Sequence, residues 1–164
     1  SNSMPAVYSL EESLERAAVS VLDAVEALDS CRIVAADVSD EDTLPCIYVR
    51  AEKLDELVLG MQTWNARLSI TLTASADQTP QTEKDFRRLP DTSDDDTGAA
   101  GYKTLWKALM DTVDADAFKA SLNATEITYV WGLEFEPIQY EQNERTFSRT
   151  IPVRLWVNEA FQAA

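Results

Sequence analysis

The chain has 164 residues, of which 45% are hydrophobic, and its 29 acidic and 14 basic residues give a formal net charge of −15. This length and apolar content suit one domain with a proper core and exclude a disordered chain. Such acidity argues against a tight grip on a phosphate backbone, which needs clustered Lys and Arg. The sequence has no histidine, which removes the most common general base and metal ligand.

The first residues of the chain and its two cysteines indicate the cellular compartment. Ser1 to Ser3 precede Met4 and are interpreted as a cloning scar, so residues 4–164 are expected to form the single domain. Cys31 and Cys46 make no CxxC pair and are predicted to be reduced thiols. No apolar run is long enough for a membrane helix, and the simplest compartment is the cytoplasm of a host cell.

The first predicted element is a helix from Ser9 to about Ser30. Ser9 and Glu12 fit the capping-box pattern S-x-x-E at its start. Apolar residues then recur at helical spacing along one face: Leu10, Leu14, Ala17, Ala18, Val21, Val25 and Leu28. An acidic connection follows over 31–42, with a short strand possible at 33–35.

Two strands are predicted next. Pro45 opens a short strand over 46–50, and the charged stretch 51–60 is expected to be a turn with a little helix. A long strand over 61–76 alternates between an apolar face and a hydroxyl-rich face that we expect to be exposed. The apolar set is Trp64, Ala66, Leu68, Ile70, Leu72 and Ala74, and the polar set is Asn65, Arg67, Ser69, Thr71 and Thr73.

The stretch 77–100 has the composition of a long loop, with two prolines and the run Asp94, Asp95 and Asp96. A loop of this length is usually functional or disordered. We expect this segment to be mobile by itself and to be ordered by a neighbour. A second helix is predicted over 101–113, with a short further turn over 114–122. Its apolar stripe is Tyr102, Leu105, Trp106, Leu109, Met110 and Val113.

The chain closes with two long alternating arms between 125 and 158, predicted to form a hairpin that projects from the domain. Apolar residues alternate along both arms: Ile127, Tyr129, Trp131, Leu133 and Phe135 in the first, and Phe147, Ile151, Val153, Leu155 and Val157 in the second. The core should include Trp131, Leu133, Ile151, Val153 and Leu155. The far end of the hairpin, 138–147, should be exposed or cross into a neighbouring subunit. The element order predicts an α+β fold, an antiparallel sheet of four or more strands with two helices packed on one face.

Candidate chemistry is sparse. Asp94, Asp95 and Asp96 are weak candidates for a Mg²⁺ or Ca²⁺ site, but three adjacent carboxylates seldom converge, so a solvated loop is favoured and no metal or cofactor is expected. Glu134 and Glu136 could divide acid and base roles, as in a small acidic hydrolase, yet a solvated strand surface is the favoured interpretation. Trp156 falls opposite the apolar face, either as a partly covered edge residue or as an anchor in a subunit contact.

Three segments carry a resemblance to a known family. They are LERAAVSVLDAVEAL (14–28), LPCIYVRAEKLDEL (44–57) running into MQTWNARLSITLTASAD (61–77), and TFSRTIPVRLWV (146–157). With them the chain resembles the tail terminator proteins of long-tailed bacteriophages, in particular the minor tail protein U type of lambdoid phages. The order of elements agrees along most of residues 8–158, although 77–100 and the closing arms are longer than the family pattern.

The resemblance implies a structural protein, not an enzyme, that closes into a ring, expected to be a hexamer. The ring caps the tail tube, ends tail polymerisation and provides the head–tail joining surface, so the partners are the chain itself, the tail tube protein and a head-completion or connector protein. DNA passes through the lumen without specific binding, no membrane is involved, and the location is the virion tail after assembly in the host cytoplasm. Interface candidates are Trp64, Arg67, Tyr140, Glu141, Glu144, Arg145, Arg154 and Trp156.

Two other kinds of function stay open at this point. The departures from the family pattern leave room for a phage neck or head–tail completion protein. A small acidic hydrolase, or a binding module that uses its acidity to mimic DNA, ranks lower.

Overall fold

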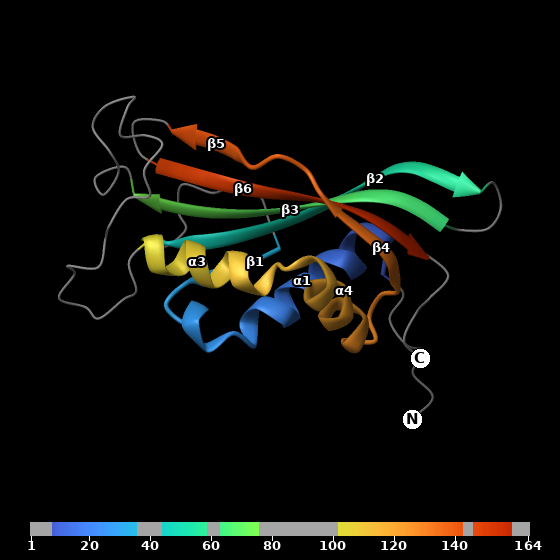
Figure 1. Ribbon diagram of the computed structural model, residues 1–164, viewed down its shortest axis with the longest axis horizontal. Coiled ribbons are helices and arrows are strands. Elements are labelled where there is room, and N and C mark those ends of the chain that lie inside the picture. The colour runs from blue at the N-terminus through green and yellow to red at the C-terminus, as the bar shows by residue number, and fades with distance from the viewer. Residues whose placement is uncertain (1–7, 36–43, 59–62, 76–101, 143–145, 159–164) are drawn as a thin grey trace.

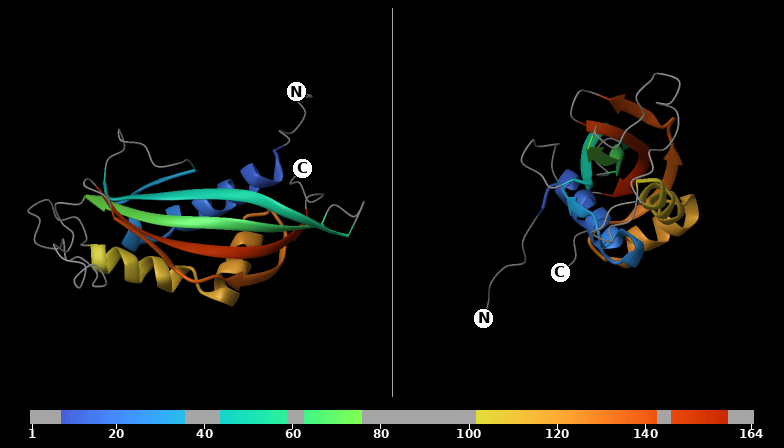
Figure 2. Two further views of the ribbon diagram at one scale, coloured as in Figure 1. Left: turned by 90° about the horizontal axis from the view of Figure 1, so that it is seen from above. Right: turned by 90° about the vertical axis from the view of Figure 1, so that its left-hand side faces the viewer.

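The fold is α+β, as the sequence predicts. The computed structural model describes residues 8–35, 44–58, 63–75, 102–142 and 146–158, and every structural statement below concerns these residues. A six-stranded sheet carries the helices α1 (Leu10–Asp23), α3 (Tyr102–Thr112) and α4 (Ala115–Ala124) on one face (Figure 1). Seen from its end, the sheet is curved and the helices lie together on one side of it (Figure 2).

Three long antiparallel strands form the centre of the sheet: β2 (Cys46–Val58), β3 (Thr63–Ser75) and β6 (Thr146–Asn158). The sheet order is β1-β2-β3-β6-β4. The short strand β1 (Arg32–Val34) pairs parallel with β2, which makes the sheet mixed instead of purely antiparallel. On the far side of β6, β4 (Val130–Phe135) and β5 (Gln139–Gln142) pair with successive parts of the same strand.

Helix α1 begins where the sequence predicts. The Ser9 side chain accepts a hydrogen bond from the backbone N–H of Glu12 at 3.1 Å, which satisfies one of the free donors at the helix start. The helix ends at Asp23, earlier than the predicted Ser30, and a short 3-10 turn, η1 (Glu26–Leu28), follows. Its buried face includes Leu22, which the predicted stripe left out.

Strand β2 is the largest departure from prediction. Residues 51–58 were expected to form a charged turn, but they continue the strand, so that prediction is wrong. The register with β3 shifts between Lys53 and Asp55 and again between Glu56 and Val58. Each irregularity moves the following side chains to the other face, which erases the alternation that marks a strand in sequence.

Helices α3 and α4 cover the core together. Leu105, Trp106, Leu109 and Val113 are buried as predicted, whereas Met110 is 39% exposed and does not belong to the buried stripe. The predicted short turn over 114–122 is the full helix α4, which buries Phe118 and Leu122. Helix α4 ends at Ala124 with Thr125 as its C-cap, and Glu126 then adopts a left-handed backbone with φ 61°.

The two closing arms differ in how well they follow their predicted faces. In β6 the predicted inward residues Ile151, Val153 and Leu155 are buried, and so are Phe147 and Val157 on the same face. In β4 Leu133 packs against the core as predicted, but the assignment of Trp131 is wrong, because Trp131 is exposed whereas its neighbour Val130 is buried. The register with β6 shifts between Val130 and Gly132, so the bulge turns Trp131 out of the core.

The segment that projects is also different from the predicted one. The ends of β2 and β3 extend past the helices in both side views (Figures 1 and 2). The far end of the closing hairpin instead pairs along β6 through β5. Phe147 is buried and Ile138 packs against the core, so only part of 138–147 is exposed; 143–145 lie outside the described residues.

Both cysteines are free thiols, as predicted. Cys46 is buried on β2, and Cys31 lies just before β1. Burial, together with the nearby Cys46, raises the pKa of the Cys31 thiol to about 12. A thiol with such a pKa stays protonated and unreactive at neutral pH.

One side chain holds the start of β4 against α4. Asn123 accepts a hydrogen bond from the N–H of Val130 at 2.7 Å and donates one to its carbonyl oxygen at 2.8 Å. Replacing Asn123 with Ala should lower the free energy of unfolding by about 1–3 kcal/mol, because two backbone groups lose their partners. Urea denaturation measures this, with Ser121→Ala on the exposed side of α4 as control. If both substitutions lower the free energy of unfolding by the same small amount, Asn123 does not hold β4 against α4.

Candidate subunit interface

The sheet face opposite the helices carries a row of charged residues. Glu52, Arg67, Arg154 and Glu134 are direct cross-strand neighbours on β2, β3, β6 and β4. Opposite charges stand side by side at both ends of the row, while two arginines meet in its middle. Directly opposed like charges destabilise a sheet, so the central pair needs a counter-charge.

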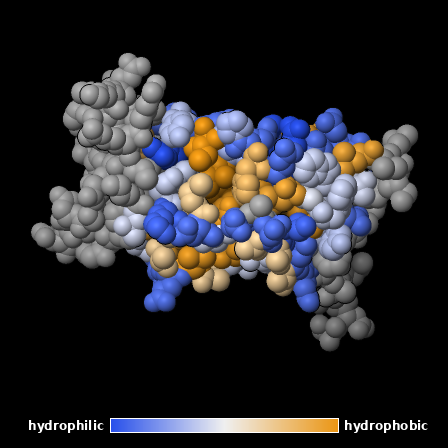
Figure 3. Space-filling model, viewed as in Figure 1, coloured by the Kyte–Doolittle hydropathy of each residue, from blue (hydrophilic) through white to orange (hydrophobic). Residues whose placement is uncertain are grey.

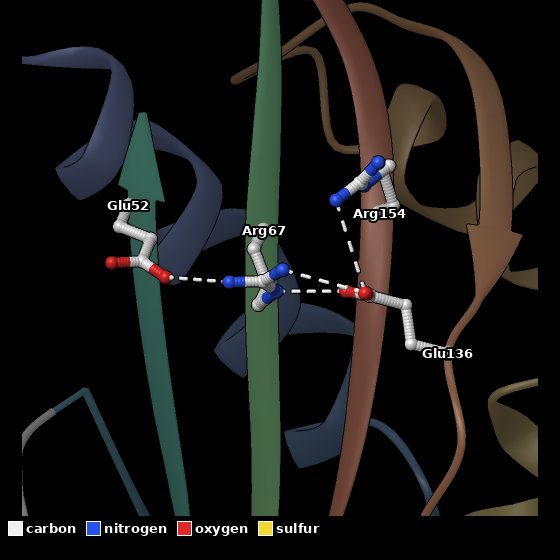
Figure 4. A network of polar contacts seen from close by, with 4 residues as sticks. All are labelled: Glu52, Arg67, Glu136 and Arg154. Atoms are coloured by element: carbon white, nitrogen blue, oxygen red, sulfur yellow. Dashed lines mark hydrogen bonds and ion pairs between the residues drawn. The ribbon is translucent and has the colours of Figure 1, made fainter. Parts of the chain in front are cut away.

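Glu136, just past the end of β4, supplies that counter-charge (Figure 4). Its carboxylate accepts two hydrogen bonds from Arg67, at 2.7 Å from Nε and 3.3 Å from the second terminal nitrogen, and lies 3.8 Å from Arg154. Glu52 accepts from the remaining terminal nitrogen of Arg67 at 3.1 Å. These hydrogen bonds raise the pKa of Arg67 and lower the pKa of Glu136, because they favour the charged form of each group.

The hydroxyl-rich part of this face is occupied within the sheet. Thr71 and Thr150 are 2.8 Å apart through their hydroxyl oxygens, and so are Thr73 and Ser148. Thr73 is fully buried, and the other three are half-buried. The expected exposed hydroxyl face is therefore wrong in part, because these groups already hydrogen-bond to each other across β3 and β6.

An aromatic pair lies at the other end of the same face. The rings of Trp131 and Trp156 have centroids 6.4 Å apart and are tilted by 45°, a geometry that adds to their hydrophobic contact. Gly132 makes room for it, since a Cβ there would lie 2.9 Å from a ring carbon of Trp156. Trp131 is 48% exposed and Tyr129 is 46% exposed. Together with Tyr129, the Trp131–Trp156 pair therefore forms an accessible aromatic surface.

The sheet has two sides on which no further described strand follows. On one side β1 covers only Cys46 to Tyr48 of β2, and on the other side β4 is the last strand in the order. A helix side chain caps each edge at one point: Glu15 accepts from the N–H of Ala51 at 2.9 Å, and Asn123 binds Val130. Such capping limits uncontrolled strand addition but leaves the side chains along both edges accessible.

A groove lies where the edge strand is interrupted between β4 and β5. It has a volume of about 550 Å³ and an apolar lining that includes Met110, Phe135, Pro137 and Ile138. Hydrophobic residues gather in the middle of this side of the molecule, around the link between β4 and β5 (Figure 3). The groove adds to the apolar surface on the β4 side of the sheet.

The predicted interface residues do not form one surface. Arg67 and Arg154 are adjacent, and Trp156 lies next along β6 on the same face. Tyr140 and Glu141 are exposed but lie near the opposite end of β6. Trp64 packs half-buried on the core side, with the ammonium of Lys53 4.5 Å above its ring.

Some predicted site residues lie outside the described residues: Glu144, Arg145, Asp94, Asp95 and Asp96. Within the described ranges, no group of three or more His, Cys, Asp or Glu residues could hold a metal ion. None of the described helices is long and apolar enough to cross a membrane.

Sequence reasoning missed several residues of this surface. Glu136 pairs with a residue 69 positions earlier in the chain, and no local signal marks that contact. The period-two pattern places Trp131 in the core, because the bulge at Gly132 is invisible in such a pattern. Glycine within an aromatic strand is the signal that could have shown it, since such a glycine often marks a bulge or a close approach.

Comparisons with known proteins add no family. No protein-family model matches the chain, and no curated protein sequence matches it significantly.

The space at Gly132 gives a test of the aromatic pair. Gly132→Ala should lower the free energy of unfolding by about 1–3 kcal/mol, because the added methyl group forces Trp156 to move. In a Trp156→Ala background the same substitution should cost little, since the obstructing ring is gone. Urea denaturation of the four proteins of this cycle measures the coupling; an equal cost in both backgrounds would show that the contact does not constrain Gly132.

The charge row should make stability depend on pH. The lowered pKa of Glu136 means that its contribution is present above the unfolded-state pKa of about 4.3 and is lost as pH falls through the folded-state pKa. Glu136→Gln should therefore be less stable than the wild type at pH 7, and the difference should shrink below pH ~4. Denaturation at several pH values measures this, and Glu134→Gln is the control because no described residue forms an ion pair with Glu134; a pH-independent difference would contradict the account.

Proposed function

We propose that the protein is a structural component of a phage or prophage tail, a tail terminator that closes into a ring on the end of the tail tube. The ring, which we expect to be a hexamer, would end tail polymerisation and provide the surface for joining to the head. On this proposal the chain is not an enzyme, and its partners are further copies of itself, the tail tube protein and a head-completion protein.

The observation that carries the proposal is the pair of accessible edges on opposite sides of one sheet. A closed ring uses heterologous contacts, in which two different surfaces of each subunit meet. Leu57 on the β2 side is 38% exposed, and the β4 side exposes Tyr129, Trp131 and Phe135. Exposed aromatic residues grouped on one side are enriched in protein–protein contacts.

The charges support a lumen through which DNA can slide. The chain carries a net charge of −15, and the two outward arginines of the charge row lie beside carboxylates. Arg67 is engaged by Glu52 and Glu136, so its charge is compensated locally. A surface of this kind repels a phosphate backbone or leaves it unbound.

Self-association and tube capping test the proposal. Sedimentation velocity over a range of concentrations should show a species larger than the monomer, either for the free protein or once tail tubes are present. Added to polymerising tail tube protein, the chain should stop elongation at amounts far below one copy per tube subunit, because only the tube end is capped. An unrelated acidic protein at equal concentration is the control.

A strictly monomeric protein that leaves tube length unchanged would contradict the proposal. Self-association without any effect on tubes would support a ring but reject the terminator function.

A further inference from the structure

The accessible apolar side chains at the two edges of the sheet lie at the same level along the strands. Glu56 on β2 is in register with Trp64 on β3, which pairs with Val157 on β6, which in turn pairs with Val130 on β4. Leu57 and Tyr129 each lie one residue from the ends of this row. The two exposed residues therefore occupy opposite ends of one line across the sheet.

This arrangement matters for a head-to-tail ring. Rotation about a ring axis carries each subunit into the next without moving it along that axis. Surfaces at the same height on opposite sides of a subunit consequently meet when strands run roughly along the axis. Leu57 of one copy is then carried to the exposed residues Tyr129 and Trp131 of the next.

The β2 edge is shaped to make such a contact. Register irregularities flank Leu54 and Leu57, and the second of these is 38% exposed at the end of a strand that extends past the helices. Bulges near a sheet edge turn side chains outward and disfavour plain backbone pairing. The contact therefore depends on side chains, with a leucine set against the aromatic surface.

Charge also bears on how the two edges meet. Glu134 is exposed on the outer face of β4, and no described residue forms an ion pair with it. With the two edges level, the facing residue of the next copy is Glu52, a like charge that its own Arg67 compensates in part. Arg50 stands on the same face two positions along β2, diagonal to Glu134 and within reach of a cross-strand ion pair.

We propose that the partner of the Tyr129–Trp131 surface is the β2 edge of a second copy of this chain, with Leu57 against the aromatic rings and Arg50 beside Glu134. The inference rests on the proposed ring and specifies which two surfaces of the subunit meet. It excludes contacts between two β2 edges and contacts between two β4 edges, because each edge binds only the opposite edge of another copy.

Two variants that each disable one edge give the test. Leu57→Lys removes the β2 contribution, and Trp131→Lys removes the β4 contribution; both positions are exposed, so the fold should persist by circular dichroism. Each variant alone should self-associate at least ~30-fold more weakly than the wild type, the factor expected for a hot-spot residue. Ser20→Lys, at an exposed position of α1 outside both edges and outside the apolar groove, is the control and should associate like the wild type.

The mixture of the two disabled variants separates the possibilities. Leu57→Lys keeps an intact β4 edge and Trp131→Lys keeps an intact β2 edge, so an equimolar mixture should form dimers that grow no further. Sedimentation velocity should show these dimers at concentrations where each variant alone is monomeric. As a second readout, Arg50→Glu and Glu134→Arg should each self-associate more weakly than the wild type. The double variant, in which the two charges are exchanged, should regain self-association.

The outcomes distinguish this contact from the ring itself. Wild-type association that both Lys variants retain would overturn the proposed contact and leave the ring standing. Monomers in the mixture, despite association of the wild type, would also overturn it. A wild type that remains monomeric at all concentrations, with or without tail tubes, would overturn both.

Discussion

The structure depends on the pairing of β6 with β3 along their whole length, from Thr146 opposite Ser75 to Asn158 opposite Thr63. One face of this pair buries five large apolar side chains of β6 against the helices, each of which contributes about 1.5–3 kcal/mol. A slip of one residue would expose all of them, so the register is fixed. Every other strand is placed relative to this pair.

The outer face follows from that fixed register. It sets Arg67 beside Arg154, and the resulting repulsion is offset by Glu136, which the chain supplies from the link after β4. It also sets Gly132 opposite Trp156, where only a residue without a side chain leaves room for the ring. The bulge beside Gly132 then turns Trp131 outward, so core packing and the exposed aromatic surface are parts of one arrangement.

The sequence was sufficient where burial is one-sided and regular. Helix α1, strand β3 and strand β6 show clean periodicity, and the structure confirms the start of α1 and the apolar faces of β3 and β6. It was insufficient where an irregularity changes the alternation, as in the second half of β2 and around Gly132 in β4. A bulge is chosen by tertiary packing, so a local pattern cannot reveal it. The candidate interface was predicted only in part for the same reason: Arg67, Arg154 and Trp156 share a face, but Trp64 packs on the core side.

We propose that this chain closes into a ring on the end of a tail tube. Electron microscopy of purified tails that carry a tagged copy of the chain tests it most directly. A tail terminator should appear as a single ring of density at one end of every complete tail, marked by the tag, and tubes should reach uncontrolled lengths when the chain is missing. Tag density distributed along the tube, or tails of normal length and unchanged ends without the chain, would contradict it.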